Sequence, residues 1–189
     1  MLKKSSREDC LKKYPSFPLR CYDEDRDEED FFYPQVISGQ WIELSTKKDE
    51  ELTDKLAKEL TNLFKSLDIE YLVFLGDTEQ PWLSTLALER KDYMPLTEAV
   101  RYFMHYKVDT GFNGGIEVSI DNVEVFLIHF YTLVRCDASL PYFHFIDNNH
   151  QILGTIHYSG QVRIDRFHEQ ANQLLEEQIS NTSFCLVEI

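Results

Sequence analysis

The sequence predicts an α+β fold, with an antiparallel β-sheet of about five to seven strands flanked by about three helices. Three observations lead to this prediction. Apolar residues recur at helical spacing in the first half, apolar and polar residues alternate between turns from Ile116 to Ile164, and a last helical pattern follows. Strands that gather late, with helices flanking them, favour an antiparallel sheet over repeated strand–helix–strand units. The chain has 189 residues, of which 43% are hydrophobic, which is enough for a sizeable core.

Residues 1–34 are predicted to form an irregular, charged N-terminal arm, and residues 35–189 a single α+β domain. Prolines interrupt the first segment at positions 15, 18 and 34, and its runs of like charge disfavour regular structure. Aromatic residues at both ends of the arm are candidates to anchor it on the body.

The domain begins with a predicted strand from Val36 to Leu44, in which Gly39 is a candidate bulge. Thr46 and Asp49 then resemble a helix-capping box, although Asp replaces the usual Glu or Gln. The helix that follows carries a stripe of apolar residues at helical spacing. This stripe consists of Leu52, Leu56, Leu60, Leu63, Phe64 and Leu67.

The middle of the chain continues this mixture of strand and helix. A strand is predicted from Tyr71 to Leu75, and the segment 81–94 is ambiguous between a loop and a short helix. A second helix is predicted from Leu96 to Tyr106, with three residues directed inward. These are Val100, Phe103 and Met104.

The pattern of apolar and polar residues in the second half of the chain predicts hairpins. Asp121 and Asn122 are interpreted as a two-residue turn after a first alternating strand. Residues 123–134 are apolar on both faces, which is typical of a central strand covered on both sides. Further strands are predicted over 142–146, 152–158 and 162–164, with a tight turn at Asn148-Asn149. A last helix is predicted from about Asp165, and a final strand over 183–189.

The net charge of −14 carries the functional prediction. Residues 1–22 carry +4 and the acid run at 23–30 carries −6, which leaves −12 for residues 31–189. Such a surface repels nucleic acid and membranes and attracts basic partners. We therefore expect a basic protein partner, and neither nucleic acid nor membrane. The candidate partner-binding residues are Asp23, Glu24, Asp25, Asp27, Glu28, Glu29, Asp30, Tyr142 and Tyr158.

Tyr142 and Tyr158 belong to a set of five aromatic residues that are not all expected to be buried in the core. Exposed Tyr and Trp side chains often anchor protein interfaces. The set comprises Trp41, Trp82, Tyr131, Tyr142 and Tyr158.

The acid run does not match a calcium-binding loop. Its first three alternate aspartates occupy EF-hand ligand positions, but Glu28 stands where glycine is required and Pro34 where glutamate is required. His168-Glu169 begins a zinc-protease pattern that the sequence does not complete. No nucleophile motif or phosphate-binding loop is present. We therefore predict no catalytic residues, no metal site and no cofactor.

Cysteine usage and the N-terminus favour a cytoplasmic protein. The four cysteines are scattered and form no CxxC pair, which is not the pattern of a disulfide scaffold or a zinc site. The N-terminus turns polar after Leu2, unlike a signal peptide. The longest apolar run, over residues 125–134, is too short to span a bilayer.

An acidic α+β protein with aromatic-rich hairpins and no catalytic motif resembles the immunity proteins of bacterial polymorphic toxin and contact-dependent growth inhibition systems. The acid run, the acidic body and the hairpins between Ile116 and Ile164 carry this resemblance. It implies a cognate toxin, often a nuclease, that the protein occludes without turnover. Some members of such families pair a strand with their partner.

Two alternatives remain. One is a small enzyme or ligand-binding domain with a histidine-containing pocket, built from His129, His144 or His157. These three histidines lie on predicted strands, and histidines on adjacent strands are able to bind a metal. The other is a DNA-mimic protein, for which the same charge argument holds with a different partner.

Overall fold

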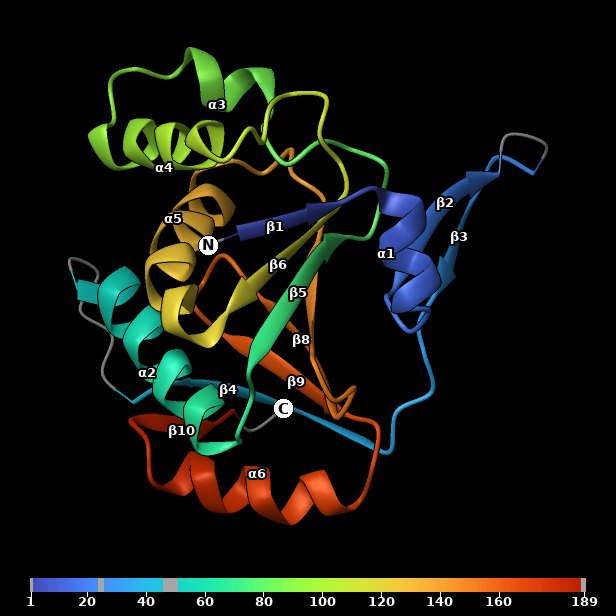
Figure 1. Ribbon diagram of the computed structural model, residues 1–189, viewed down its shortest axis with the longest axis vertical. Helices are drawn as coiled ribbons and strands as arrows, with labels where there is room; N and C mark the ends of the chain where they lie inside the picture. The colour runs from blue at the N-terminus through green and yellow to red at the C-terminus, as the bar shows by residue number, and fades with distance from the viewer. Residues whose placement is uncertain (1, 24–25, 46–50, 188–189) are drawn as a thin grey trace.

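The computed structural model describes residues 2–23, 26–45 and 51–187, apart from the side chains of residues 23 and 170–174 (Figure 1). Eight strands of this part form one antiparallel sheet, in the order β1-β6-β5-β7-β8-β9-β4-β10. The α+β class is confirmed, while the sheet has more strands than the sequence predicts. The strands are β1 (Leu2–Ser5), β4 (Ser38–Leu44), β5 (Tyr71–Gly76), β6 (Gly115–Ser119), β7 (Phe143–Asp147), β8 (Ile152–Ile156), β9 (Val162–Arg166) and β10 (Phe184–Leu186).

Helices cover both faces of this sheet unequally (Figure 1). The first face is covered by a layer of three helices that contact one another in the order α2, α5, α4. The short helix α3 packs against α4, and α6 lies beside β10. Six α-helices occur in the described residues, twice the predicted number. They are α1 (Arg7–Lys13), α2 (Leu52–Ser66), α3 (Thr85–Glu89), α4 (Met94–His105), α5 (Val123–Cys136) and α6 (Gln170–Ser180).

The main core lies between the sheet and the helical layer. The predicted apolar stripe of α2 is confirmed, since all six of its residues are buried. The ring of Phe74 on β5 lies 4.7 Å from Phe126 and 5.3 Å from Phe130, centroid to centroid. Trp82 is buried against Phe143, and its indole N–H donates to the carbonyl of Gly114. The N–H group of this buried indole is therefore hydrogen-bonded, as is usual for a buried Trp.

The predicted central strand over residues 123–134 is wrong, because this segment forms helix α5. The buried positions Val123, Phe126, Leu127 and Phe130 follow the helical spacing, and Val125 is 52% exposed. The sequence alone did not reveal this pattern, because almost every residue of the segment is apolar. Both the helical period of 3.6 residues and the strand period of two residues fit such a segment. The predicted turn at 121–122 lies in a 3₁₀ turn that leads into the helix.

The prediction of an irregular arm over residues 1–34 is also wrong for the described residues. β1 pairs with β6 at one edge of the sheet, and α1 lies against the sheet's second face. Cys10, Tyr14 and Phe17 are buried there. They pack against sheet residues whose side chains point away from the main core, namely Val73, Leu75, Ile146 and Leu153. The early segment therefore builds a second, smaller core that its charge pattern did not indicate.

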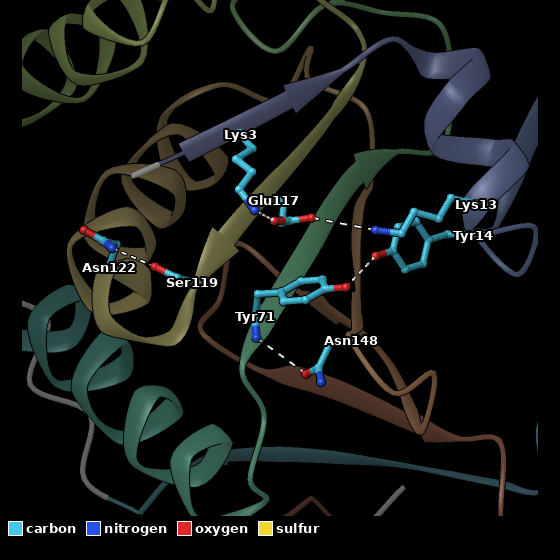
Figure 2. A network of polar contacts seen from close by, with 8 residues as sticks. All are labelled: Lys3, Lys13, Tyr14, Tyr71, Glu117, Ser119, Asn122 and Asn148. Carbon is cyan, nitrogen blue, oxygen red and sulfur yellow. Dashed lines mark hydrogen bonds and ion pairs between the residues drawn. The ribbon is translucent and has the colours of Figure 1, made fainter.

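A network of polar contacts joins this early segment to the sheet (Figure 2). Glu117 of β6 accepts from Lys3 at 2.6 Å and lies 3.9 Å from the Nζ of Lys13 at the end of α1. The Tyr14 hydroxyl donates to that of Tyr71 at 3.4 Å. Burial is the main cause that raises the pKa of Tyr14 above its ordinary value. These contacts attach α1 to β5 and β6.

Three local predictions also need correction. Met104, predicted to face inward, is 52% exposed. The β7–β8 loop has four residues, not two, because the Asp147 carboxylate accepts from the backbone N–H groups of Gln151 and Ile152. Asp165 lies in β9, and the last helix begins only at residue 170.

Other local predictions are confirmed. A strand spans Phe184–Leu186, as expected. The segment 81–94, which the sequence left ambiguous, contains a short helix over Thr85–Glu89. The proposed capping box at Thr46 and Asp49 lies outside the described residues.

Candidate functional site

The described residues of the acid run, 23 and 26–30, lie on a two-stranded hairpin formed by β2 (Leu19–Asp23) and β3 (Glu28–Phe32). The hairpin extends away from the body of the molecule (Figure 1). The side chains at 27–30 are all exposed, whereas Glu24, Asp25 and the side chain of Asp23 lie outside the described part. Arg26 pairs with Asp30 at 2.6 Å, and the Tyr22 hydroxyl donates to Asp27. A regular hairpin therefore presents the carboxylates at 27–30.

The same hairpin exposes three large aromatic residues. Tyr22 is 59% exposed, Phe31 53% and Phe32 50%. Apolar side chains of this size, gathered beside charged groups, are typical of protein-binding surfaces. The aromatic residues at both ends of the arm were candidates to anchor it on the body. Tyr14 and Phe17 at one end and Tyr33 at the other pack in the second core, whereas Phe31 and Phe32 are exposed.

Arg20 attaches the hairpin to the sheet. Its backbone N–H donates to the carbonyl of Asp77 at 2.8 Å, and its Nε lies 3.2 Å from the Asp77 carboxylate. The guanidinium also lies over the rings of Phe31 and Tyr142, at 5.5 and 5.4 Å from their centroids. Burial raises the pKa of Asp77, and the neighbouring Arg20 opposes that rise.

A cavity of about 330 Å³ lies beside this attachment on the second face of the sheet. One row of directly opposed residues crosses the sheet there, from His144 through Thr155 and Arg163 to Trp41. Opposed residues on neighbouring strands point to the same face. The complete lining is Arg20, Phe31, Tyr33, Trp41, Asp77, Tyr142, His144, Thr155 and Arg163.

The lining of this cavity includes one histidine, His144, which is deeply buried. It is 6% exposed, and its Nδ1 has no hydrogen-bond partner. Burial, together with the positive charges of Arg163 and Arg20, lowers the pKa of His144 to about 3. The imidazole is therefore neutral at physiological pH, and the arginines supply the positive charge of the cavity.

Arg163 is held by a buried carboxylate. Its Nε donates to both oxygens of Asp165 at 3.0 Å, and the Tyr33 hydroxyl donates to the same carboxylate. A Cβ at Gly39 would lie 1.9 Å from an oxygen of Asp165, so only glycine leaves room for this arrangement. Gly39 pairs regularly with Asp165 in the sheet, and the predicted bulge is not formed.

A second cavity, of about 180 Å³, brings together the two tyrosines that the sequence singled out. Tyr142 is 58% exposed and Tyr158 63% exposed, and both line this cavity together with His157. Trp82 and Tyr131 are buried instead. Because Tyr142 lines both cavities, the exposed surface continues from the hairpin through Arg20 and Tyr142 to Tyr158.

The three candidate histidines do not converge. His129 lies on α5 and stacks on Tyr102 at 4.3 Å, in the helical layer. His157 lines the second cavity, with its Nδ1 2.8 Å from the hydroxyl of Ser159. Within the described residues, no three His, Cys, Asp or Glu side chains are placed to hold a metal ion.

Sequence reasoning did not connect the other residues that build the first cavity, although it singled out Trp41 as an aromatic residue. Arg20, Asp77, Trp41 and Arg163 are far apart in the chain. The strand order pairs Trp41 with Arg163, and the contact between β2 and the end of β5 adds Arg20 and Asp77. One signal was present. Arg163 and Asp165 alternate with apolar residues in a strand, so the face opposite the main core had to accommodate charge.

None of the described helices has the length and apolar character needed to cross a membrane. Comparison of the chain with protein-family models, with curated proteins and with solved structures gave no match.

Proposed function

We propose that this chain is a non-catalytic binding protein whose β2–β3 hairpin docks a basic partner protein. The partner class follows the resemblance to immunity proteins: a cognate toxin, such as a nuclease, that the chain neutralises by occlusion. The observation that carries the proposal is the combination on one protruding hairpin of exposed carboxylates with exposed aromatic rings. The carboxylates are those of Asp27, Glu28, Glu29 and Asp30, and the rings are those of Tyr22, Phe31 and Phe32.

The two kinds of side chain contribute differently to binding. Carboxylates attract a basic surface over a distance and raise the association rate, while their contribution is screened by salt. Aromatic side chains contribute affinity because they bury a large area with few rotatable bonds. A two-stranded hairpin also has an outer edge on each strand, which supports strand addition as a binding mode.

The sequence places −6 on the acid run and −12 on residues 31–189, so the run and the body are both acidic. We propose that both belong to one docking face, because the Arg20 guanidinium lies against Phe31 of the hairpin and Tyr142 of the body. Tyr158 extends this face further along the body.

The test uses the product of the neighbouring gene as the partner, co-purified with the chain and titrated by calorimetry. We expect a one-to-one complex whose affinity falls as salt rises. The hairpin variant D27N/E28Q/E29Q/D30N is expected to bind at least 100-fold more weakly.

A matched control removes the same charge elsewhere. The variant D54N/E89Q/E98Q/E124Q neutralises four exposed carboxylates on α2, α3, α4 and α5. We expect it to change affinity less than threefold. Equal losses in the two variants would show a general charge effect, and absence of a complex would contradict the proposed partner.

A further inference from the structure

We propose that the cavity beneath the hairpin is a binding site for a small planar organic anion, such as an aromatic carboxylate. The two arginines bind the anionic group and the aromatic walls cover the planar body. This inference concerns a different ligand from the basic protein and does not depend on the hairpin docking it.

The polar atoms around the cavity are incompletely satisfied. Among the described residues, five buried side-chain nitrogen or oxygen atoms lack a hydrogen-bond partner, and three of them belong to this lining. They are the Nε of Arg20, the Oδ2 of Asp77 and the Nδ1 of His144. The first two lie 3.2 Å apart as an ion pair without hydrogen-bond geometry. These two atoms compensate each other electrostatically, so the Nδ1 of His144 is the lining atom left with neither a hydrogen bond nor an ion pair. Buried polar groups are nearly always satisfied, so this unpaired nitrogen beside a cavity points to a ligand.

The charged side chains of the lining that reach the cavity surface are positive. Outside the lining, Glu29 of the hairpin accepts from Nη1 of Arg20 at 3.4 Å. The Arg20 side chain is 34% exposed and that of Arg163 38% exposed, whereas Asp77 and Asp165 are almost fully buried behind them. In its ion pair with Asp165, Arg163 uses only its Nε, so the N–H groups of its two Nη atoms are left to meet another acceptor. Guanidinium groups suit planar carboxylates because they present parallel N–H donors. An anion is therefore the ligand class that these donors select.

The aromatic side chains that line the cavity favour a ligand with a planar ring. Phe31, Tyr33, Trp41 and Tyr142 surround the cavity, and its volume of about 330 Å³ lies at the small end of ligand-binding sites. His144 lines the cavity as a neutral group, so it adds no charge of its own. The net charge of −14 does not prevent anion binding here, because charges more than about 8 Å away are largely screened at physiological salt.

The experiment compares 2-naphthoate with its uncharged analogue 2-naphthamide, by calorimetry and by chemical-shift mapping on the isotope-labelled wild-type protein. We expect saturable one-to-one binding of 2-naphthoate, with the largest shifts at the Trp41 indole and the His144 ring. We expect 2-naphthamide to bind at least tenfold more weakly, because it lacks the charge-assisted hydrogen bonds. Equal affinity for the two probes, shifts that map to another surface, or no saturable binding of 2-naphthoate would each overturn the proposal.

Variants locate the site independently. Thr155→Trp fills the cavity from β8 while both arginines remain, and it is expected to abolish binding. Arg20→Gln is expected to weaken binding at least tenfold, and Arg101→Gln, which removes an exposed arginine on α4, less than twofold. Unchanged binding in Thr155→Trp, or equal losses in the two arginine variants, would contradict the assignment.

Discussion

The Nε atom of Arg20 lies 3.2 Å from Oδ2 of Asp77, and this ion pair joins the acidic hairpin to the end of β5. Asp77 is only 2% exposed, whereas the Arg20 side chain is about one-third exposed. The positive charge that compensates the buried Asp77 carboxylate is therefore supplied by Arg20 of the protruding hairpin. Both the proposed docking face and the proposed anion site include Arg20, so this contact links the two.

Arg20→Gln is expected to lower the free energy of unfolding at pH 7 by about 1–3 kcal/mol, because it leaves a buried carboxylate without its positive partner. Burial raises the folded pKa of Asp77, and removal of Arg20 raises it further. Protonation therefore relieves the penalty, and the difference from wild type is expected to shrink as the pH falls towards that pKa. Urea unfolding at pH 7 and pH 4.5 measures this, with Arg101→Gln as the control. A difference that stays constant or grows on acidification would contradict it.

His144 is expected to make the protein less stable in mild acid. Its folded pKa is about 3, below the ordinary value of 6.5. Between these two values His144 is protonated in the unfolded chain and neutral in the folded chain. The stability that this group contributes is complete above pH 6.5 and is lost as the pH falls from there towards 3. Between pH 7 and pH 5 the loss is about 2 kcal/mol.

The variant His144→Gln removes this proton linkage. The drop in unfolding free energy between pH 7 and pH 5 is expected to be about 2 kcal/mol smaller than in wild type. His168→Gln, at an exposed position, serves as the matched control. Equal pH slopes in wild type and His144→Gln would show that the imidazole is not held neutral.

Substitutions along residues 123–134 distinguish the helix from the strand that the sequence suggested. Phe126→Ala is expected to destabilise the protein by about 3–5 kcal/mol, because it opens a cavity between Phe74 and Phe103. Val125→Ala is expected to cost no more than about 0.5 kcal/mol, since Val125 is half exposed. In a strand covered on both faces, both substitutions would be costly. Chemical denaturation of the two variants gives the comparison.

A side chain at Gly154 is expected to destabilise the sheet. It lies opposite Phe145 in the β7–β8 pair, and a Cβ there would lie 2.1 Å from the Phe145 ring. Gly154→Ala forces that buried ring to move and is expected to cost about 1–3 kcal/mol. At Gly111 the nearest atom to an added Cβ is 3.5 Å away, so Gly111→Ala is the control and is expected to change stability little. Similar melting temperatures for the two variants would contradict this reading of the sheet.

Local patterns predicted the elements whose two sides differ in polarity. The stripe of α2 alternates with charged residues, so its helical period is unambiguous, and the six predicted positions are buried. Segment 123–134 lacks that contrast, so a helix and a buried strand fit it equally until the packing is known. The N-terminal segment was misjudged for the opposite reason. Its charges dominate, while a few apolar residues, such as Tyr14 and Phe17, decide how it folds.

The sequence by itself determined the fold class, most of the strands, the long helix α2 and the acidic character that favours a basic partner. Only the tertiary structure decided that the described acidic residues at 27–30 lie on a hairpin and that Trp41, His144, Thr155 and Arg163 share one cavity. The physical reason is the range of the interactions. Periodicity and charge depend on neighbours along the chain, whereas a cavity depends on strand order and register, which bring Trp41 opposite Arg163.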